Sequence, residues 1–164
     1  MGINKIIMND TLRQNDSEKE YAILRLGRIT RLGDCEAILG KENIRIFGGI
    51  PGELVKARIY RYRKNKENVI SGIVDQIIEP SPYRIVAECI YFGSCSGCQW
   101  QYIDYQYQLE LKKQIILDAF QAYEFLKNTN INNVIASKKE FNYRNHARFS
   151  VRFEGQIGFS NRIT

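Results

Sequence analysis

Five short apolar runs, separated by turn residues, fill the first half of the chain. The turns contain glycine, proline or asparagine, which reverse a chain through conformational freedom or stiffness. Runs of this length predict β-strands. Because a small sheet hides its edges best by closing on itself, we expect a five-stranded antiparallel barrel. The predicted strands are YAILRLG (21–27), EAILG (36–40), NIRIFGG (43–49), ELVKARIYRYR (53–63) and NVISGIVDQIIE (68–79).

The fourth run combines an apolar face with cations and tyrosines. Successive side chains of a strand point to opposite faces, so Val55, Ala57 and Ile59 are expected to point inward. No acidic residue lies between positions 55 and 66. Cations beside aromatic rings suit a phosphate backbone with exposed bases, although a solvated hairpin tip would show the same pattern. The predicted outer face comprises Lys56, Arg58, Tyr60, Tyr62 and Lys64, and the candidate RNA contacts add Arg61, Arg63 and Lys66.

Two prolines and a longer periodic segment follow the strand-rich region. Pro80 and Pro82 end the last strand and stiffen the link, so we expect a domain boundary there. From Gln101 to about Lys127 apolar residues recur at helical spacing, with Asp104 as N-cap. This helix is expected to pack in a core.

Three of the four cysteines stand within ten residues. Cys89, Cys95 and Cys98 form a C-x5-C-x2-C motif with two interleaved glycines. Crowded thiolates select soft metals, and three close cysteines with a remote partner are commoner for iron-sulfur clusters than for zinc. The spacing leaves two alternatives open: a zinc site that recruits His146 as a further ligand, or no bound metal. Cys35 is far from the motif and is expected to pack as a small hydrophobe.

The last part of the chain predicts a loop and one hairpin. Residues 128–137 are read as a loop or a short strand. RNHARFSVRF (144–153) alternates apolar and polar positions, which predicts a half-buried strand, and QIGFS (156–160) would return beside it. Apolar faces would stay uncovered, so we expect the rest of a sheet to be missing and the chain to be a fragment.

The composition is that of a globular protein with a modest basic excess. Lys and Arg outnumber Asp and Glu by 24 to 18, giving a net charge of +6 and a pI of about 9.2. Neither a secretion signal nor a membrane-spanning stretch is recognisable, so a cytoplasmic location without membrane association is predicted. Residues 1–18 are expected to form a disordered leader, and no protein partner is predicted.

The order of these features resembles the S-adenosylmethionine-dependent RNA uracil-5 methyltransferases that carry an iron-sulfur cluster. IRIFGGIPGELVKARI (44–59) is similar to the consensus of the TRAM domain, a small RNA-binding barrel. SPYRIVAECIYFGSCSGCQWQYIDYQYQLELKK (81–113) is similar to the family's cysteine triplet and following helix. YRNHARFSV (143–151) looks like the strand that opens the central RNA-binding domain.

The resemblance implies a mainly β fold with some α: a five-stranded antiparallel OB-like TRAM barrel, then a cysteine-rich loop, a helix and the start of an α+β central domain. The implied division is 19–80 for the barrel, 81–127 for the cysteine loop and helix, and 128–164 for an incomplete central domain. A 4Fe-4S cluster would be held by Cys89, Cys95 and Cys98, with the fourth family ligand outside this chain. Arg144, His146, Arg148 and Arg152 could extend the RNA surface, although for His146 a structural role is favoured.

The implied function is part of 5-methyluridine formation in rRNA or tRNA. In the family, a cysteine thiolate attacks carbon 6 of uracil and S-adenosylmethionine methylates carbon 5. The catalytic domain is expected to be absent here, so the 164 residues alone should be inactive. Two alternatives stay open: a free-standing TRAM module that binds RNA without catalysis, and a zinc-stapled structural domain.

Overall fold

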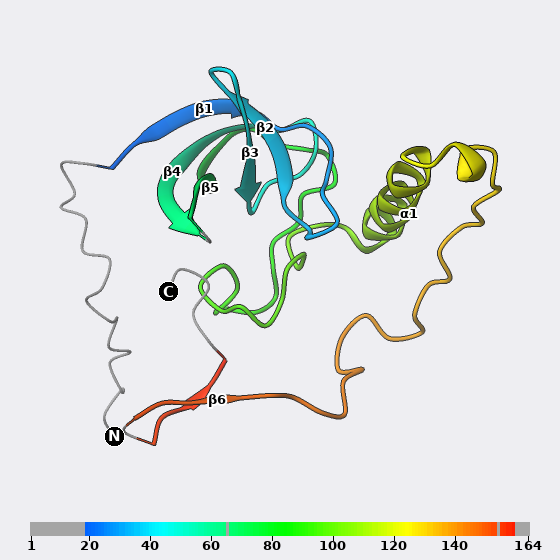
Figure 1. Ribbon diagram of the computed structural model, residues 1–164. Coiled ribbons are helices and arrows are strands. Elements are labelled where there is room, and N and C mark those ends of the chain that lie inside the picture. The colour runs from blue at the N-terminus through cyan, green and yellow to red at the C-terminus, as the bar shows by residue number, and fades with distance from the viewer. Residues whose placement is uncertain (1–18, 65, 154, 160–164) are drawn as a thin grey trace.

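A computed structural model describes residues 19–64, 66–153 and 155–159, so the predicted leader at 1–18 lies outside the described residues. A curled sheet forms one body and a helix lies beside it (Figure 1). The secondary structure comprises β1 (Tyr21–Arg25), β2 (Cys35–Leu39), β3 (Glu42–Phe47), β4 (Leu54–Lys64), β5 (Glu67–Glu79), α1 (Tyr105–Gln121), the short 3-10 helix η3 (Glu124–Leu126), β6 (Ser150–Val151) and β7 (Ile157–Gly158).

All five predicted strands are present, but they do not form a wholly antiparallel sheet. The strand order is β1-β4-β5-β3-β2. Neighbours pair antiparallel except β3 and β5, which run parallel where 45–47 meets 71–73. The antiparallel prediction is therefore wrong for this pair, because β4 and β5 form one long hairpin and β5 returns in the direction of β3. The sheet is a curled half-barrel.

The sheet curls around a compact apolar core. Register shifts in the β4–β5 ladder at Leu54/Val55 and Lys56/Ala57 bend the long hairpin. Near the two edges, the chain after β1 bonds to β2, with Gly27 N donating to Glu36 O at 2.7 Å. The buried residues at the centre are Leu24, Leu26, Cys35, Ala37, Ile44, Ile46, Val55, Ala57 and Ile59. The inward orientation predicted for the last three is confirmed.

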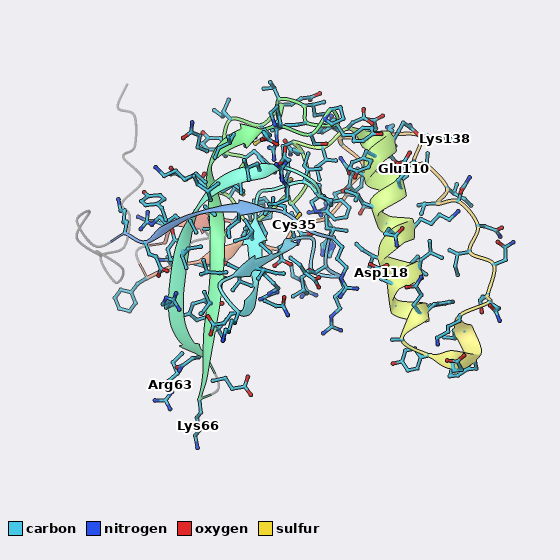
Figure 2. The ribbon with its side chains drawn as sticks, turned by 90° about the horizontal axis from the view of Figure 1, so that it is seen from above. Cys35, Arg63, Lys66, Glu110, Asp118 and Lys138 are labelled. Atoms are coloured by element: carbon cyan, nitrogen blue, oxygen red, sulfur yellow. The ribbon has the colours of Figure 1, made fainter. Side chains whose placement is uncertain are left out.

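Cys35 lies in this core. Its side chain is fully buried, and its Sγ donates to Gly49 O at 3.3 Å. Figure 2 shows it inside the half-barrel, away from the surface. The packing role predicted for this cysteine is confirmed.

The helix α1 is shorter than predicted, because the chain leaves the α-helix at Gln121 and forms one 3-10 turn. Asp104 is the N-cap, as expected, and its Oδ1 accepts from Tyr107 N at 3.2 Å. A second core joins this helix to the half-barrel. It contains Ile29, Ile50, Tyr102, Ile103 and Leu111.

One buried ion pair joins the sheet to the chain that follows it. Glu53 is 1% exposed, and its carboxylate accepts from Arg84 Nε at 2.6 Å and Nη2 at 2.7 Å. The same carboxylate accepts from the backbone amides of Ile50 at 2.9 Å and Ser81 at 3.0 Å. Arg84 also donates to Gly48 O and lies 4.6 Å from the centre of the Tyr102 ring. Both charges are thereby satisfied by several partners.

A second set of contacts between the sheet and the later part of the chain lies at the turn between β1 and β2. Gly33 O accepts from Trp100 Nε1 at 2.8 Å, and Leu32 O accepts from Gln99 Nε2 at 3.1 Å. Gly33 has a φ of 83°, and a Cβ there would lie 3.0 Å from Trp100 Nε1. Glycine is therefore required both by the backbone conformation and by the close indole.

The half-buried strand predicted at 144–153 is not found. Only Ser150 and Val151 form β6, which pairs with β7, and Val151 is 69% exposed. A two-stranded ribbon buries little by itself, and its apolar side chains Val151 and Ile157 stay largely exposed. Residues 128–137 form no strand. No helix within the described residues has the length and apolar character needed to cross a bilayer.

We predict that Glu53→Gln lowers the free energy of unfolding by about 3 to 5 kcal/mol, because the variant leaves the Arg84 guanidinium without its counter-charge. Denaturant unfolding followed by circular dichroism measures this. The matched control is Glu79→Gln, which breaks an exposed pair with Arg25 and should cost under about 1 kcal/mol. Equal costs for the two variants would contradict the central role of Glu53.

The same pair predicts a specific acid sensitivity. Burial raises the pKa of Glu53, but hydrogen bonds from Arg84, Ser81 and Ile50 outweigh it and hold the pKa below its ordinary value of 4.5. A lowered folded-state pKa contributes stability above the unfolded value, and this contribution is lost as the pH falls through the folded pKa. The stability difference between wild type and Glu53→Gln should therefore be constant above about pH 5 and shrink below about pH 4. A difference that grows with acid would contradict this assignment.

Candidate RNA-binding hairpin and cysteine loop

The hairpin of β4 and β5 carries most of the predicted RNA contacts. Its strands pair as far as Lys64 and Glu67. Lys66 has a φ of 70° in the turn between them, a conformation that few side chains adopt. In Figure 2 the labelled Arg63 and Lys66 lie at the far tip of the hairpin, away from α1. The hairpin thus reaches beyond the core that its inner residues build.

Cations and rings contact one another on the outer face. Lys56 Nζ lies 4.7 Å from the centre of the Tyr21 ring, and the Arg58 guanidinium lies 5.1 Å from that of Tyr60. Arg58 is half-buried, and its Nε has no hydrogen-bond partner among the residues that the structure describes. Tyr62 is 45% exposed. Stacked cation and ring pairs keep this face ordered and leave its charge at the surface.

Arg61 points to the other face and is held by carboxylates. Its Nε and Nη2 each donate to Glu20 at 2.9 Å, and Nη1 lies 3.9 Å from Glu42. The hydrogen bond with Arg61 lowers the pKa of Glu20, and the same bond raises the pKa of Arg61. The charge of Arg61 is therefore compensated within the chain, which the local sequence did not indicate because Glu20 lies 41 positions away.

Arg63 differs from Arg61 in its partners. Its Nε donates to Lys66 O at 3.4 Å, and no ion pair to a carboxylate is found for it among the described residues. A groove of about 420 Å³ lies beside it, and its other lining residues are Glu42, Arg61, Tyr62, Asn68, Val69 and Ile70. Asn68 was not anticipated as a site residue. The hairpin register, which pairs Asn68 with Arg63, is the feature that would have identified it.

Hydrogen bonds close the cysteine loop at its base and order its interior. Cys89 N donates to Gln101 Oε1 at 3.2 Å, and Cys95 N donates to Tyr91 O at 3.0 Å. Cys95 is half-buried, whereas Cys89 and Cys98 are exposed. Gly97 N donates to Cys95 Sγ at 3.3 Å. The loop therefore presents two of its cysteines at the surface and the third partly covered.

These cysteines suit a soft metal by their chemistry but not by their present arrangement. Thiolates are the ligands that iron-sulfur clusters and zinc prefer. Within the described residues, however, no group of three or more His, Cys, Asp or Glu side chains is placed to hold a metal ion. His146 is exposed and is not brought to the cysteines as a further ligand. The loop would have to tighten to bind through all three sulfurs.

A second hollow lies between the half-barrel and the cysteine loop. It has a volume of about 380 Å³ and is lined by Phe47, Val74, Arg84, Phe92, Gly93 and Tyr102. Arg84 faces this hollow while bound to Glu53. The loop therefore lies against the sheet near the central ion pair.

The other predicted RNA contacts lie on the irregular segment before β6. Arg144 and Arg148 are both exposed, and the Arg144 guanidinium lies 5.9 Å from the Tyr143 ring. In Figure 1 this orange segment runs below the sheet, apart from the tip of β4. The structure does not join these arginines to the hairpin in one surface.

Comparison with known proteins relates the chain to RNA methyltransferases. An uncharacterized RNA methyltransferase of Aquifex aeolicus (strain VF5) is 38% identical over 109 residues, which are 66% of this chain and 25% of that protein. One from Caldanaerobacter subterraneus subsp. tengcongensis is 32% identical over 119 residues, 73% of this chain and 25% of the relative. One from Nanoarchaeum equitans is 36% identical over 110 residues, 66% of this chain and 22% of the relative.

The chain thus spans about a quarter of the length of the curated relatives it matches. No model of a known protein family matches it.

We predict that the two kinds of cysteine differ in reactivity. Burial, followed by the nearby Glu53 and Asp34 carboxylates, raises the pKa of the Cys35 thiol to about 12. Because the thiolate is the nucleophile, iodoacetamide at about pH 8 should modify Cys89 and Cys98 in the native chain and leave Cys35 unmodified. Peptide mass spectrometry reads the sites, and unfolding in denaturant is the control that should release Cys35. Equal labelling of Cys35 and Cys89 in the native chain would contradict the packing.

Proposed function

We propose that this chain is the RNA-binding and iron-sulfur region of an RNA uracil-5 methyltransferase that acts on rRNA or tRNA. The observation that carries the proposal is the relation to RNA methyltransferases, found in a chain that combines a basic hairpin with a triple-cysteine loop. The chain corresponds to about a quarter of such a protein. We place it at the N-terminal end of these proteins and divide it into a TRAM barrel at 19–80, a cluster loop and helix at 81–127, and the start of a central domain.

RNA binding is supported by the charge and shape of the hairpin. Lys56 and Arg58 lie beside Tyr21 and Tyr60, and the long strands carry further cations to the tip. Phosphates are bound by cations and exposed bases stack on rings, so a hairpin with both can hold single-stranded RNA. Contacts with the backbone alone would position the RNA and carry little sequence information.

The cysteine loop would hold a 4Fe-4S cluster through Cys89, Cys95 and Cys98. The cluster would supply a covalent brace between the loop and the neighbouring fold. This chain's residues already anchor the loop through Gln101 and Trp100. Tightening of the loop would bring the thiolates together while those anchors stay in place.

Methyl transfer belongs to the rest of the full-length protein in this proposal. S-adenosylmethionine would donate the methyl group there, and a target uridine would have to leave its stack to be modified. The residues described in this chain would bind and orient the RNA. We assign no catalytic residue among them.

The metal content of the chain tests the proposal. Protein of all 164 residues, made and purified without oxygen, should contain iron and acid-labile sulfide and absorb visible light. Cys95→Ser should abolish this absorption. Cys35→Ala, which removes the one thiol outside the loop, is the matched control and should retain the cluster.

Zinc at one ion per chain without iron would contradict the cluster assignment and favour a zinc-stapled structural domain. A folded chain that binds RNA but takes up no metal points first to the fourth ligand outside these residues, so the same measurement on a longer chain that includes that ligand decides between the cluster and a free-standing RNA-binding module. Loss of the cluster in both cysteine variants would indicate unfolding, which circular dichroism of each variant decides.

A further inference from the structure

The groove beside Arg63 is built by the register of two strands. Arg61 pairs with Ile70 and Arg63 pairs with Asn68 across the β4–β5 ladder. Directly paired residues project from the same face of a sheet, so the four side chains share the inner face of the hairpin. Glu42, at the start of β3, lines the opposite side. Most of the lining therefore lies on the face opposite to Lys56, Arg58 and Tyr60, and the intervening pair of Tyr62 and Val69 contributes the remaining edge of the groove.

Its chemistry suits a small group that carries both an anion and a polar ring. The Arg63 guanidinium is a planar fork that matches phosphate oxygens, and it has no carboxylate partner among the described residues. The exposed Asn68 amide can donate and accept hydrogen bonds. Ile70 is half-buried and provides an apolar floor. A volume of about 420 Å³ falls within the range of roughly 300 to 1,000 Å³ that is typical of small-molecule sites.

Arg61 has a different role in this groove. Its two hydrogen bonds to Glu20 fix the guanidinium and offset its charge. An arginine whose position is fixed and whose charge is offset forms part of the groove wall, but it attracts an anion less strongly than Arg63 does. Of the two arginines that line the groove, Arg63 is thus the one without a carboxylate partner in the described part of the chain.

We propose that this groove is a subsite for one nucleotide of single-stranded RNA, with the phosphate on Arg63 and the base edge on Asn68. The inference rests on the proposed RNA-binding function and deepens it, because it assigns the RNA to the inner face of the hairpin. The outer face, where Lys56 and Arg58 lie against rings, is then a secondary contact.

Paired variants of β4 test the assignment. Arg63→Gln and Lys56→Gln each remove one positive charge from the same strand, on opposite faces. Binding of a fluorescent oligouridine of about eight nucleotides is followed by anisotropy at several salt concentrations. Arg63→Gln should weaken binding about tenfold and reduce the slope of log K against log salt by about 0.7. Lys56→Gln removes a cation of the secondary outer face, so it should weaken binding by only about threefold, clearly less than Arg63→Gln does.

Asn68→Ala separates the base contact from the phosphate contact. It removes hydrogen bonds but no charge, so binding should weaken about fivefold while the salt slope stays unchanged. Circular dichroism of each variant establishes that it folds. If a variant does not fold, photocrosslinking of wild-type chain to an oligonucleotide containing 4-thiouridine replaces it, and crosslinks should map to peptides that contain residues 61–70.

The outcomes distinguish this inference from the function on which it rests. Equal weakening by Arg63→Gln and Lys56→Gln, or crosslinks confined to residues 56–60, would overturn the subsite and leave RNA binding in place. No binding by the folded wild-type chain at low salt would overturn the proposed function, and the subsite with it.

Discussion

The carboxylate of Glu53 is the point on which the arrangement of this chain depends. It accepts from the turn before β4, from the chain after β5 and from Arg84. Since a buried carboxylate is costly without such partners, the three segments must come together for any one of them to be stable. Arg84 in turn lies over Tyr102, so the ion pair also sets where the helical part meets the half-barrel.

The two candidate sites differ in how firmly the folded core holds them. The cysteine loop follows Arg84 and is fastened again by Trp100 to Gly33, so its ends are held by the folded core. The tip of the hairpin projects from the other part of the sheet, beyond the buried core residues of β4. Glu20 and Arg61 stiffen its base, while Arg63 remains accessible at the end. The loop is suited to bracing a fold, and the hairpin to meeting a ligand.

Local patterns in the sequence were sufficient for the strands, the Asp104 cap and the burial of Cys35, because each depends on neighbouring residues. The parallel pairing of β3 with β5 could not be predicted in the same way, since it depends on how a long hairpin returns across the sheet. The strand expected at 144–153 failed for a related reason, because alternation alone does not supply a partner surface. The role of Arg61 also required the fold, which brings Glu20 to it across 41 positions.

The two faces of the hairpin show why charge counts alone are a poor guide to a binding site. Both faces of β4 carry cations, yet their partners differ: rings for Lys56 and Arg58, carboxylates for Arg61, and a carbonyl for Arg63. A cation that already has an anion near it gains less from a phosphate than one that has none. The position of acids such as Glu20 therefore selects which of several equivalent-looking arginines is available to an anion.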